Sequence, residues 1–307
     1  MSEAMRIGII GCDTSHVTAF TKVLHDESEP YHVAGGRVVA AYPSFSRDVA
    51  NSKNRVEGFT SELRENWQVN ICQNVEEVLE QVDVVLLESV DGRRHLAELR
   101  PVVEAGKPVF MDKPFAANLA DAKEMVRLLN EAGVGCFSSS ALRFDPNVKA
   151  LLDQMQPGEI LACDAFGPAP LEPTNPGLFW YGIHGVEMLY TLMGAGCKSV
   201  CCTSTDDYDL VVGCWGDRIG TVRGVRVGKS DYEATVFCEG GVHHVARNRE
   251  VPIYAGLLAQ IIEFFRTGRA PVGLDETLEI MAFMEAALAS SQNGGRPVDL
   301  GGMLAEM

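Results

Sequence analysis

The sequence has little positive charge. Its 26 Lys and Arg residues face 42 Asp and Glu residues, which gives a formal net charge of −16 over 307 residues. Nucleic acids and anionic membranes bind basic protein surfaces, so we expect neither as a partner. No apolar run reaches the roughly 18 residues that span a bilayer. The opening segment, MSEAMRIGII, also lacks the basic start, apolar stretch and cleavage site of a signal peptide, which predicts a cytoplasmic protein.

Paired cysteine motifs are missing as well. The nine cysteines are scattered, and no two of them form a CxxC pair. This excludes the common structural zinc sites and thioredoxin-type redox centres, and we predict no metal site. Several cysteines lie in apolar segments such as Val134–Phe137 and Val211–Trp215. A thiol there behaves as a small apolar group, so we expect reduced cysteines in a reducing compartment.

The first half of the chain alternates strand-like and helix-like segments. Short apolar or β-rich runs recur between helical patterns, at Met5–Ile10, Gly36–Tyr42, Val69–Cys72, Asp83–Glu88, Pro108–Met111 and Val134–Ser138. Repeated β-α units with short connections predict a doubly wound parallel sheet of the Rossmann type. Ligands bind such sheets at the carboxyl ends of the strands, so the residues that follow each run are the candidate site residues.

The second half predicts a different architecture. From about residue 159, β-type segments follow one another, and the turn-forming pairs Gly216-Asp217 and Gly240-Gly241 separate some of them. We therefore expect an open, mostly antiparallel sheet in an α+β domain. Helices are expected near Phe179–Met193, Ile253–Thr267 and Glu276–Ser290. The Asp145-Pro146 pair separates the two patterns, which predicts one domain over residues 1–143 and another over 144–307.

The connection after the first strand lies where a dinucleotide-binding turn would lie. Gly11 follows the strand and a helix comes next, as the G-x-G-x-x-G fingerprint requires, with Thr14 and Ser15 in the loop. However, Asp13 takes the second glycine position and His16 takes the third. A carboxylate ~4 Å from a phosphate would repel it by about 4 kcal/mol, unless a cation such as protonated His16 offsets it. Alternatively, Asp13 caps the helix and occupies the anion site itself.

The end of the second strand lacks the acidic residue that usually binds the adenosine ribose. A polar segment with Ser44, Ser46 and Arg47 stands there instead. These side chains suit a 2′-phosphate better than a ribose hydroxyl, so NADP is at least as plausible a cofactor as NAD. The same residues would also form an ordinary polar loop, and both interpretations stay open.

Two further segments end at the same edge of the predicted sheet. Lys113 directly follows the fifth strand, and Pro114 restricts the backbone beside it. A lysine beside a cofactor can donate to a substrate oxygen and transfer a proton if its pKa is lowered. After the fourth strand, Arg93 and Arg94 offer the positive charge that an anionic ligand needs, and His95 follows them.

His184 and Glu187 are the candidate site residues of the second half. They lie three residues apart on a predicted helix and therefore share one face of it. Imidazole is the usual proton carrier near neutral pH, although a histidine among apolar residues is more often structural. A metal bound through His184 and Glu187 would need further ligands that the sequence does not indicate.

Together these segments resemble the Gfo/Idh/MocA family of NAD(P)-dependent oxidoreductases. The resemblance runs over nearly the whole chain, through Ile7–Gly11, Asp83–His95, AGKPVFMDKP at 105–114, RFDP at 143–146, GIHGVE at 182–187 and the tail Pro271–Val298. It implies a Rossmann domain followed by an α/β domain that binds substrate and carries an open antiparallel sheet. Members commonly form oligomers through the face of that sheet, and most act on sugars, polyols and related compounds.

The resemblance also implies roles for single residues. Lys113 corresponds to the lysine of the family's EKP motif, which assists proton transfer and orients substrate, and Asp112 replaces the Glu. His184 corresponds to the histidine that contacts the substrate hydroxyl. Trp180 stands where the family often has Asp and would offer an apolar platform for a sugar, whereas Glu187 stands where many members have Asp. Arg93 and His95, chosen for their place at the ligand edge rather than from the resemblance, complete the expected substrate site.

The resulting hypothesis is hydride transfer between a nicotinamide and a hydroxyl-bearing carbon, with Lys113 and His184 as catalytic residues. The alternative is a cofactor-poor relative that acts as a sensor or binding subunit without redox activity. A metal-assisted lyase or hydrolase that uses His184 and Glu187 is a weaker third possibility.

Overall fold

The computed structural model describes residues 4–155 and 159–305. The chain divides into two compact units, the first ending at Ser139 and the second beginning at Ser140. Residues 254–274, which include all but the first residue of helix α9 (Ile253–Thr267), return to the first unit. The division expected from the sequence, 1–143 and 144–307, differs in this helix. Chain order cannot reveal the return of α9, which follows from its apolar contacts, such as Phe264 against Phe137.

The first unit contains the predicted doubly wound parallel sheet, which is confirmed. Its six strands are β1 (Met5–Ile10), β2 (Gly36–Tyr42), β3 (Asn70–Ile71), β4 (Val84–Leu87), β5 (Val109–Met111) and β6 (Cys136–Ser138). Their order is β3-β2-β1-β4-β5-β6, and all neighbouring pairs are parallel. The order reverses at β1, where β2 and β4 lie on its two sides. Ligands of such sheets bind at this switch point, outside the carboxyl ends of the strands.

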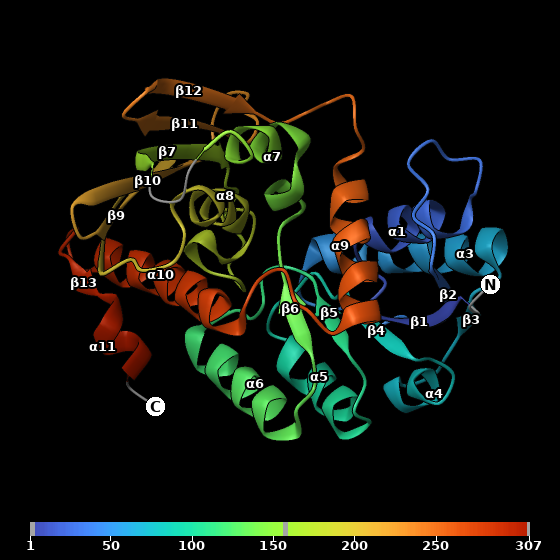
Figure 1. Cartoon of the computed structure of the whole chain (residues 1–307). Helices are drawn as coiled ribbons and strands as arrows, with labels where there is room; N and C mark the ends of the chain where they lie inside the picture. Colours follow the sequence, from blue (N-terminus) through green and yellow to red (C-terminus); the bar gives the residue numbers. More distant parts are fainter. Residues whose placement is uncertain (1–3, 156–158, 306–307) are drawn as a thin grey trace. The chain divides into compact units, whose positions relative to one another are not determined.

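Helices cover both faces of this sheet (Figure 1). Besides α9 they are α1 (His16–His25), α2 (Ala50–Lys53), α3 (Val56–Trp67), α4 (Val75–Leu79), α5 (His95–Glu104) and α6 (Leu119–Ala132). In Figure 1, α4, α5 and α6 lie on one side of the sheet, and α1, α3 and α9 lie on the other. The side chain of Asn118 caps α6 by accepting from the Asp121 amide, and Gly133 ends it in the left-handed conformation.

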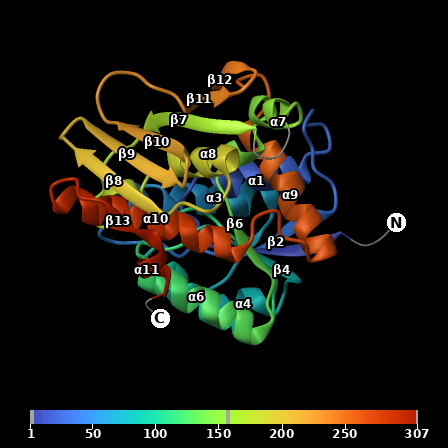
Figure 2. The same ribbon diagram turned by 60° about the vertical axis from the view of Figure 1, so that its left-hand side comes forward.

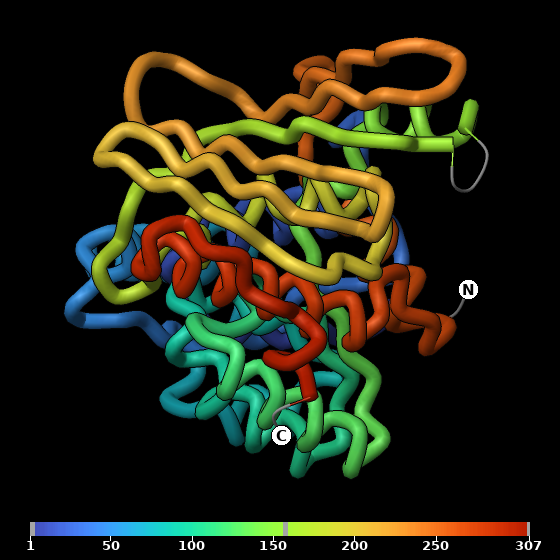
Figure 3. The backbone as a smooth tube through the Cα atoms, turned by 90° about the vertical axis from the view of Figure 1, so that its left-hand side faces the viewer, coloured from blue at the N-terminus to red at the C-terminus, as the bar shows by residue number. Residues whose placement is uncertain are grey.

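The second unit is built on a seven-stranded sheet, seen in Figure 2. Its strands are β7 (Ile160–Pro168), β8 (Ser199–Ser204), β9 (Tyr208–Trp215), β10 (Arg218–Val225), β11 (Glu233–Cys238), β12 (Gly241–Ala246) and β13 (Val298–Asp299). The order is β12-β11-β7-β10-β9-β8-β13, and Figure 3 shows the strands side by side. Only β7 and β10 pair in parallel, so the predicted mostly antiparallel sheet is confirmed.

Helices lie against one face of the second sheet, and the other face carries exposed apolar side chains. The helical segments are η1 (Ala141–Phe144), α7 (Pro146–Leu152), η2 (Gly177–Phe179), α8 (Ile183–Met193), α10 (Leu274–Gln292) and α11 (Leu300–Ala305). α8 packs along β7 and β10, and Phe283 of α10 contacts Trp215. On the open face, the exposed fractions are 44% for Leu161, 50% for Ile219 and 63% for Val242.

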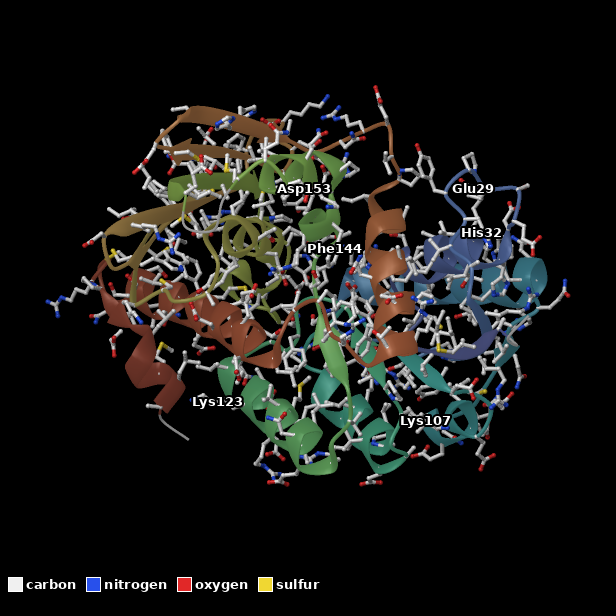
Figure 4. All side chains as sticks on the ribbon, viewed as in Figure 1. Glu29, His32, Lys107, Lys123, Phe144 and Asp153 are labelled. Carbon is white, nitrogen blue, oxygen red and sulfur yellow. The ribbon has the colours of Figure 1, made fainter. Side chains whose placement is uncertain are left out.

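A histidine joins the end of α1 to the second strand of the first sheet. His25 Nε2 accepts a hydrogen bond of 2.9 Å from the Val38 amide, and the edge of Trp67 packs against its ring. The connection from α1 to β2 that this bond closes includes Glu29 and His32, both labelled in Figure 4. Burial, with a contribution from the Arg37 charge, lowers the pKa of His25 to about 4. The native state therefore holds a neutral ring whose Nε2 is an acceptor.

This contact makes the stability of the protein depend on pH. The pKa of His25 is about 4 in the folded state, against 6.5 for an unperturbed histidine. The unfolded chain therefore binds the proton more tightly, and the stabilisation is present above pH 6.5 and is lost as the pH falls towards 4. We expect urea unfolding at pH 7 and pH 5 to show a smaller pH effect in His25→Gln than in the wild type. If the free energy of unfolding fell by the same amount between pH 7 and pH 5 in His25→Gln and in the wild type, this assignment would be contradicted.

Candidate functional site

The turn between β1 and α1 requires a glycine. Gly11 has φ +89°, and its amide donates to the Tyr42 carbonyl at 3.0 Å. A Cβ at this position would lie 2.3 Å from the backbone nitrogen of Ser89, which follows β4. The backbone of the turn thus runs directly against the end of β4, and only glycine allows both the approach and the positive φ.

Asp13 is fully buried, and its carboxylate bonds to residues outside α1. One oxygen accepts from the Val90 amide at 3.0 Å, and the other accepts from the Ser52 hydroxyl at 2.5 Å. Burial raises the pKa of Asp13 above its ordinary value, although these two hydrogen bonds act in the opposite direction. Ser15 stands at the N-cap of α1 without a side-chain hydrogen bond to the helix and is exposed. Thr14 Oγ1 accepts from the His16 amide at 3.4 Å.

Three ionisable side chains meet at the carboxyl edge of the first sheet. His16 begins α1, Glu88 follows β4 and Asp112 follows β5. His16 Nδ1 lies 3.0 Å from Asp112 Oδ2 and 3.4 Å from Glu88 Oε2. The two carboxylates are buried completely or nearly so. Burial lowers the pKa of His16, but the Asp112 charge outweighs it and the pKa is raised to about 9. Burial raises the pKa of Glu88 to about 7.

Lys113 joins this cluster from the same connection. Its exposed fraction is 6%, and its Nζ lies 3.9 Å from Asp112 Oδ2. The other Asp112 oxygen accepts from the Lys113 amide at 2.8 Å. Burial raises the pKa of Asp112, but the positive charges of His16 and Lys113 outweigh it and hold the pKa well below its usual range. Asp112 therefore holds a negative charge between two cationic side chains.

The residues predicted for the adenosine end lie between β2, β4 and α5. Here a pocket of about 400 Å³ is lined by Phe45, Ser46, Arg47, Asp48, Asp91, Arg93 and Arg94. The Ser46 hydroxyl donates to buried Asp91, and Arg93 bonds to both Asp91 and Asp48. Arg47 is exposed at this pocket.

Beneath this pocket, two predicted residues are buried. The Ser44 hydroxyl donates to Glu98 and accepts from Arg94 Nε. His95 places its two ring nitrogens 3.0 Å from the Phe115 carbonyl and 2.6 Å from the Ser89 carbonyl. The His95 ring therefore links the start of α5 to the backbone after β4 and β5.

In the second unit, His184 lies at the start of α8 among aromatic rings. Its Nδ1 lies 2.7 Å from the Ser140 hydroxyl, whose oxygen also accepts from the Leu142 amide at 3.2 Å. The rings of Tyr181 and Tyr232 lie 6.0 and 5.0 Å from the His184 ring, centre to centre. A hydroxyl held in this way fixes the orientation of the imidazole.

Glu187 and Trp180 are buried close to this histidine in sequence. Glu187 Oε2 accepts from two nitrogens of Arg143, at 3.0 and 2.7 Å, and Arg143 also donates to Glu276 at 2.7 Å. The exposed fraction of Trp180 is 5%, and its ring packs against Tyr181. The carboxylate of Glu187 is thus engaged with the segment that carries Ser140.

The sequence does not single out several partners in these arrangements, among them Ser52, Glu88, Ser140 and Arg143. Glu88 could have been found, because it ends the apolar run Val84–Leu87 at the predicted ligand edge. Arg143 had been noted only as part of the RFDP motif. Ser52 lies on α2, which the sequence pattern did not predict, and its contact with Asp13 spans 39 positions.

Comparisons with known proteins identify the fold of the first unit. Residues 5–139 match the GFO_IDH_MocA family model, described as "Oxidoreductase family, NAD-binding Rossmann fold". The first unit thus matches the NAD-binding Rossmann fold of the Gfo/Idh/MocA oxidoreductase family, and over these residues the resemblance noted in the sequence is confirmed. A curated relative, the uncharacterized oxidoreductase YhhX of Escherichia coli, is 28% identical over 138 residues. That alignment covers 41% of this chain and 40% of YhhX.

Solved structures share the fold of the whole chain. A probable dehydrogenase from Thermotoga maritima aligns with a TM-score of 0.79 at 22% identity, over 97% of this chain and 99% of that one. The scyllo-inositol dehydrogenase of Lactobacillus casei aligns with a TM-score of 0.77 at 13% identity, over 98% and 99%. In the part of the chain that the structure describes, no helix has the length and apolar character to cross a membrane.

Proposed function

We propose that this protein is an NAD(P)-dependent oxidoreductase that transfers a hydride between a nicotinamide ring and a hydroxyl-bearing carbon of a sugar, polyol or related compound. The observation that carries the proposal is the position of Lys113. It is a buried lysine at the carboxyl end of β5, beside a charged Asp112, in a unit that matches an NAD-binding family. The solved relatives with inositol dehydrogenase names share this fold and support the substrate class.

The residues of the first unit fit a dinucleotide. Gly11 brings the backbone turn close, and the N-cap residue Ser15 makes no side-chain hydrogen bond to α1, so amides at the start of α1 can face a phosphate. The Asp13 carboxylate, which would repel a phosphate, is bonded to Val90 and Ser52. We assign the pyrophosphate to Gly11, Asp13, Thr14, Ser15 and His16 through the backbone amides and the His16 charge. When bound, the nicotinamide supplies the hydride chemistry.

At the adenosine end, the choice between NAD and NADP depends on charge. Arg93 and Arg94 offset the neighbouring carboxylates Asp91 and Glu98, to which they are bonded. Exposed Arg47 is the residue that we assign to the ribose or its 2′-phosphate, with Ser46 beside it and Ser44 beneath. NAD is the cofactor that the family description names, and NADP binding would depend on Arg47.

The protein's part in the reaction is to position the substrate and move a proton. Lys113 Nζ would donate to the reacting oxygen, with its position set by Asp112. His184 would exchange the proton with the substrate, and its ring is oriented by the Ser140 hydroxyl. We propose that Trp180 lines the substrate side in the second unit. Arg93 and His95, which we had expected to bind substrate, instead support the adenosine side, because Arg93 lines that pocket and the buried His95 ring bonds to two carbonyls. Glu187 supports His184 indirectly, since it anchors Arg143 in the segment that carries Ser140.

The test is direct hydride transfer. Purified protein is incubated with NAD⁺ or NADP⁺ and a panel of inositols, open-chain polyols and aldoses, and nicotinamide absorbance is followed. The proposal predicts reduction of one nicotinamide by at least one polyol or sugar. Failure of both cofactors with the whole panel, in protein that binds NADH, would exclude this substrate class while leaving the cofactor assignment intact.

We further propose a cytoplasmic homo-oligomer. All nine cysteines are free thiols, which fits a reducing compartment. The open face of the second sheet exposes Leu161, Ile219 and Val242, and an exposed apolar surface of this kind is typical of protein interfaces. Light scattering should give a mass that is a multiple of 33.3 kDa. A monomer mass at micromolar concentration would contradict the assembly.

A further inference from the structure

A cluster of buried metal-ligand side chains lies in the first unit, and the proposed hydride transfer does not require it. Its members are His16, Glu88 and Asp112, each of which offers one ligand atom, and these atoms all lie within 4.8 Å of one another. Glu88 and Asp112 directly follow β4 and β5, and His16 is the first residue of α1, after the loop that leaves β1. The sheet therefore places them together independently of any single flexible loop.

The second observation is that these buried atoms lack hydrogen-bond partners. Among the described residues, no hydrogen bond satisfies either oxygen of Glu88, Oδ2 of Asp112 or Nδ1 of His16. The exposed fraction of Glu88 is 0%, and that of Asp112 is 1%. Their nearest polar neighbours are one another, since Nδ1 of His16 lies 3.0 Å from the Asp112 oxygen and 3.4 Å from Oε2 of Glu88. A cation coordinated by one atom of each side chain would satisfy groups that are otherwise buried without hydrogen bonds.

The spacing of the atoms suits a small divalent cation. Zinc binds histidine nitrogen and carboxylate oxygen at about 2.0–2.2 Å, so two ligand atoms of a tetrahedral ion lie roughly 3.3 Å apart. Here Nδ1 of His16 lies 3.0 Å from the Asp112 oxygen and 3.4 Å from the Glu88 oxygen. The geometry therefore needs only small movements to close around an ion.

The charge of the cluster also favours a cation. Asp112 and Glu88 already lie 3.0 and 3.4 Å from Nδ1 of His16, in positions that stabilise a positive charge there. A metal ion would replace the proton on that nitrogen and would face the same two carboxylates. His16, whose side chain is 10% exposed, is the ligand closest to solvent and marks the route of entry.

From these observations we infer that the first unit binds one divalent transition-metal ion through His16, Glu88 and Asp112. A nitrogen and two carboxylate oxygens suit Zn²⁺, Mn²⁺ or Fe²⁺ better than Ca²⁺, which prefers six or more oxygen ligands. Three protein ligands leave one tetrahedral position open, as in catalytic zinc sites. The inference goes beyond the proposed function, and the same edge of the sheet would then hold both an ion and Lys113.

The experiment is a calorimetric titration of the full-length protein with ZnCl₂, after treatment with EDTA and dialysis, in the absence of any nicotinamide. We expect one ion per chain with micromolar or tighter affinity. Glu88→Gln, which keeps the shape of the side chain, and His16→Asn should each weaken binding at least a hundredfold. Glu98→Gln is the matched control, because Glu98 is also a buried carboxylate of this unit but bonds to Ser44 and Ser89. It should bind Zn²⁺ as the wild type does.

Two further measurements separate this site from the free cysteines. Co²⁺ bound at the cluster should show d–d absorption without a thiolate charge-transfer band. Zn²⁺ should raise the Tm of the wild type and of Glu98→Gln, but not of Glu88→Gln or His16→Asn, since only a ligand of the folded state stabilises it. Absence of binding, equal binding by all four proteins, or a thiolate band would each overturn the inference. NADH binding is measured separately, so either proposal can fail without the other.

Discussion

Replacing Lys113 with methionine should lower kcat at least a hundredfold. Methionine fills nearly the same volume but carries no ammonium group, so the reacting oxygen loses its donor and the proton loses its carrier. General acid–base groups typically contribute a factor of ~10²–10⁴ to the rate. Because His16 remains 3.0 Å from Asp112, this buried carboxylate keeps a cationic partner in Lys113→Met, and the fold should stay intact. The measurement is kcat with the preferred nicotinamide and the best substrate of the polyol and sugar panel.

Lys107→Met provides the control for this prediction. Lys107 precedes β5, whereas Lys113 follows it, so the two lysines lie at opposite ends of one strand. The Lys107 ammonium donates to the Val82 carbonyl at 2.9 Å, and Figure 4 labels its position before β5. Turnover of Lys107→Met should stay close to that of the wild type. If Lys113→Met turned over substrate as fast as Lys107→Met, Lys113 would have no part in the mechanism.

Gly11→Ala should destabilise the protein by about 3 kcal/mol and abolish dinucleotide binding. The positive φ of +89° is strained for alanine, and the new methyl group would lie 2.3 Å from the Ser89 backbone nitrogen. To remove this clash, the turn after β1 must move away from the end of β4. That movement displaces the backbone amides at the start of α1 that would face the phosphates. Urea unfolding measures the first effect, and nicotinamide fluorescence measures the second.

Gly58→Ala is the matched control for the same substitution. Gly58 lies within α3, and a Cβ added there meets no atom within 4 Å. Alanine favours a helix interior over glycine by about 1 kcal/mol, so this variant should be slightly more stable than the wild type. Its NADH affinity should be unchanged. Equal stability of the two alanine variants would show that the turn does not need glycine.

The strands were predictable from the sequence because their apolar runs are short and sharply bounded. β1 and β2 agree with the expected ranges, and α9 has the expected bounds, Ile253–Thr267. Its membership of the first unit depends on contacts with β6, more than a hundred positions earlier, which no local pattern encodes. α3 was missed because its mixed polar composition conceals the apolar face that buries Val56 and Leu63.

The edge of the sheet at which the site lies was also predictable from the sequence. The contacts among the site residues were predictable only in part. Asp112 and Lys113 come directly after β5, and His16 stands at the start of the helix after β1. Their place at the carboxyl edge of a parallel sheet is therefore predictable from the sequence. Their mutual distances depend on side-chain packing, which the sequence does not specify. The same holds for Glu187, whose partner Arg143 lies 44 positions away. Asp13 is the clearest example of what the sequence does not specify. From the sequence, its carboxylate could either cap α1 or repel a phosphate. In the structure, the carboxylate accepts hydrogen bonds from the Val90 amide and the Ser52 hydroxyl.

Titration of the purified protein with NADH, followed by nicotinamide fluorescence, tests most directly whether the first unit is a cofactor-binding domain. With Asp13 bonded to Val90 and Ser52, its charge is directed away from the amides of α1, and binding should saturate at micromolar concentrations. A parallel titration with NADPH compares the two cofactors. If neither nucleotide bound up to millimolar concentrations, the assignment of an oxidoreductase would be wrong, although the Rossmann fold would stand.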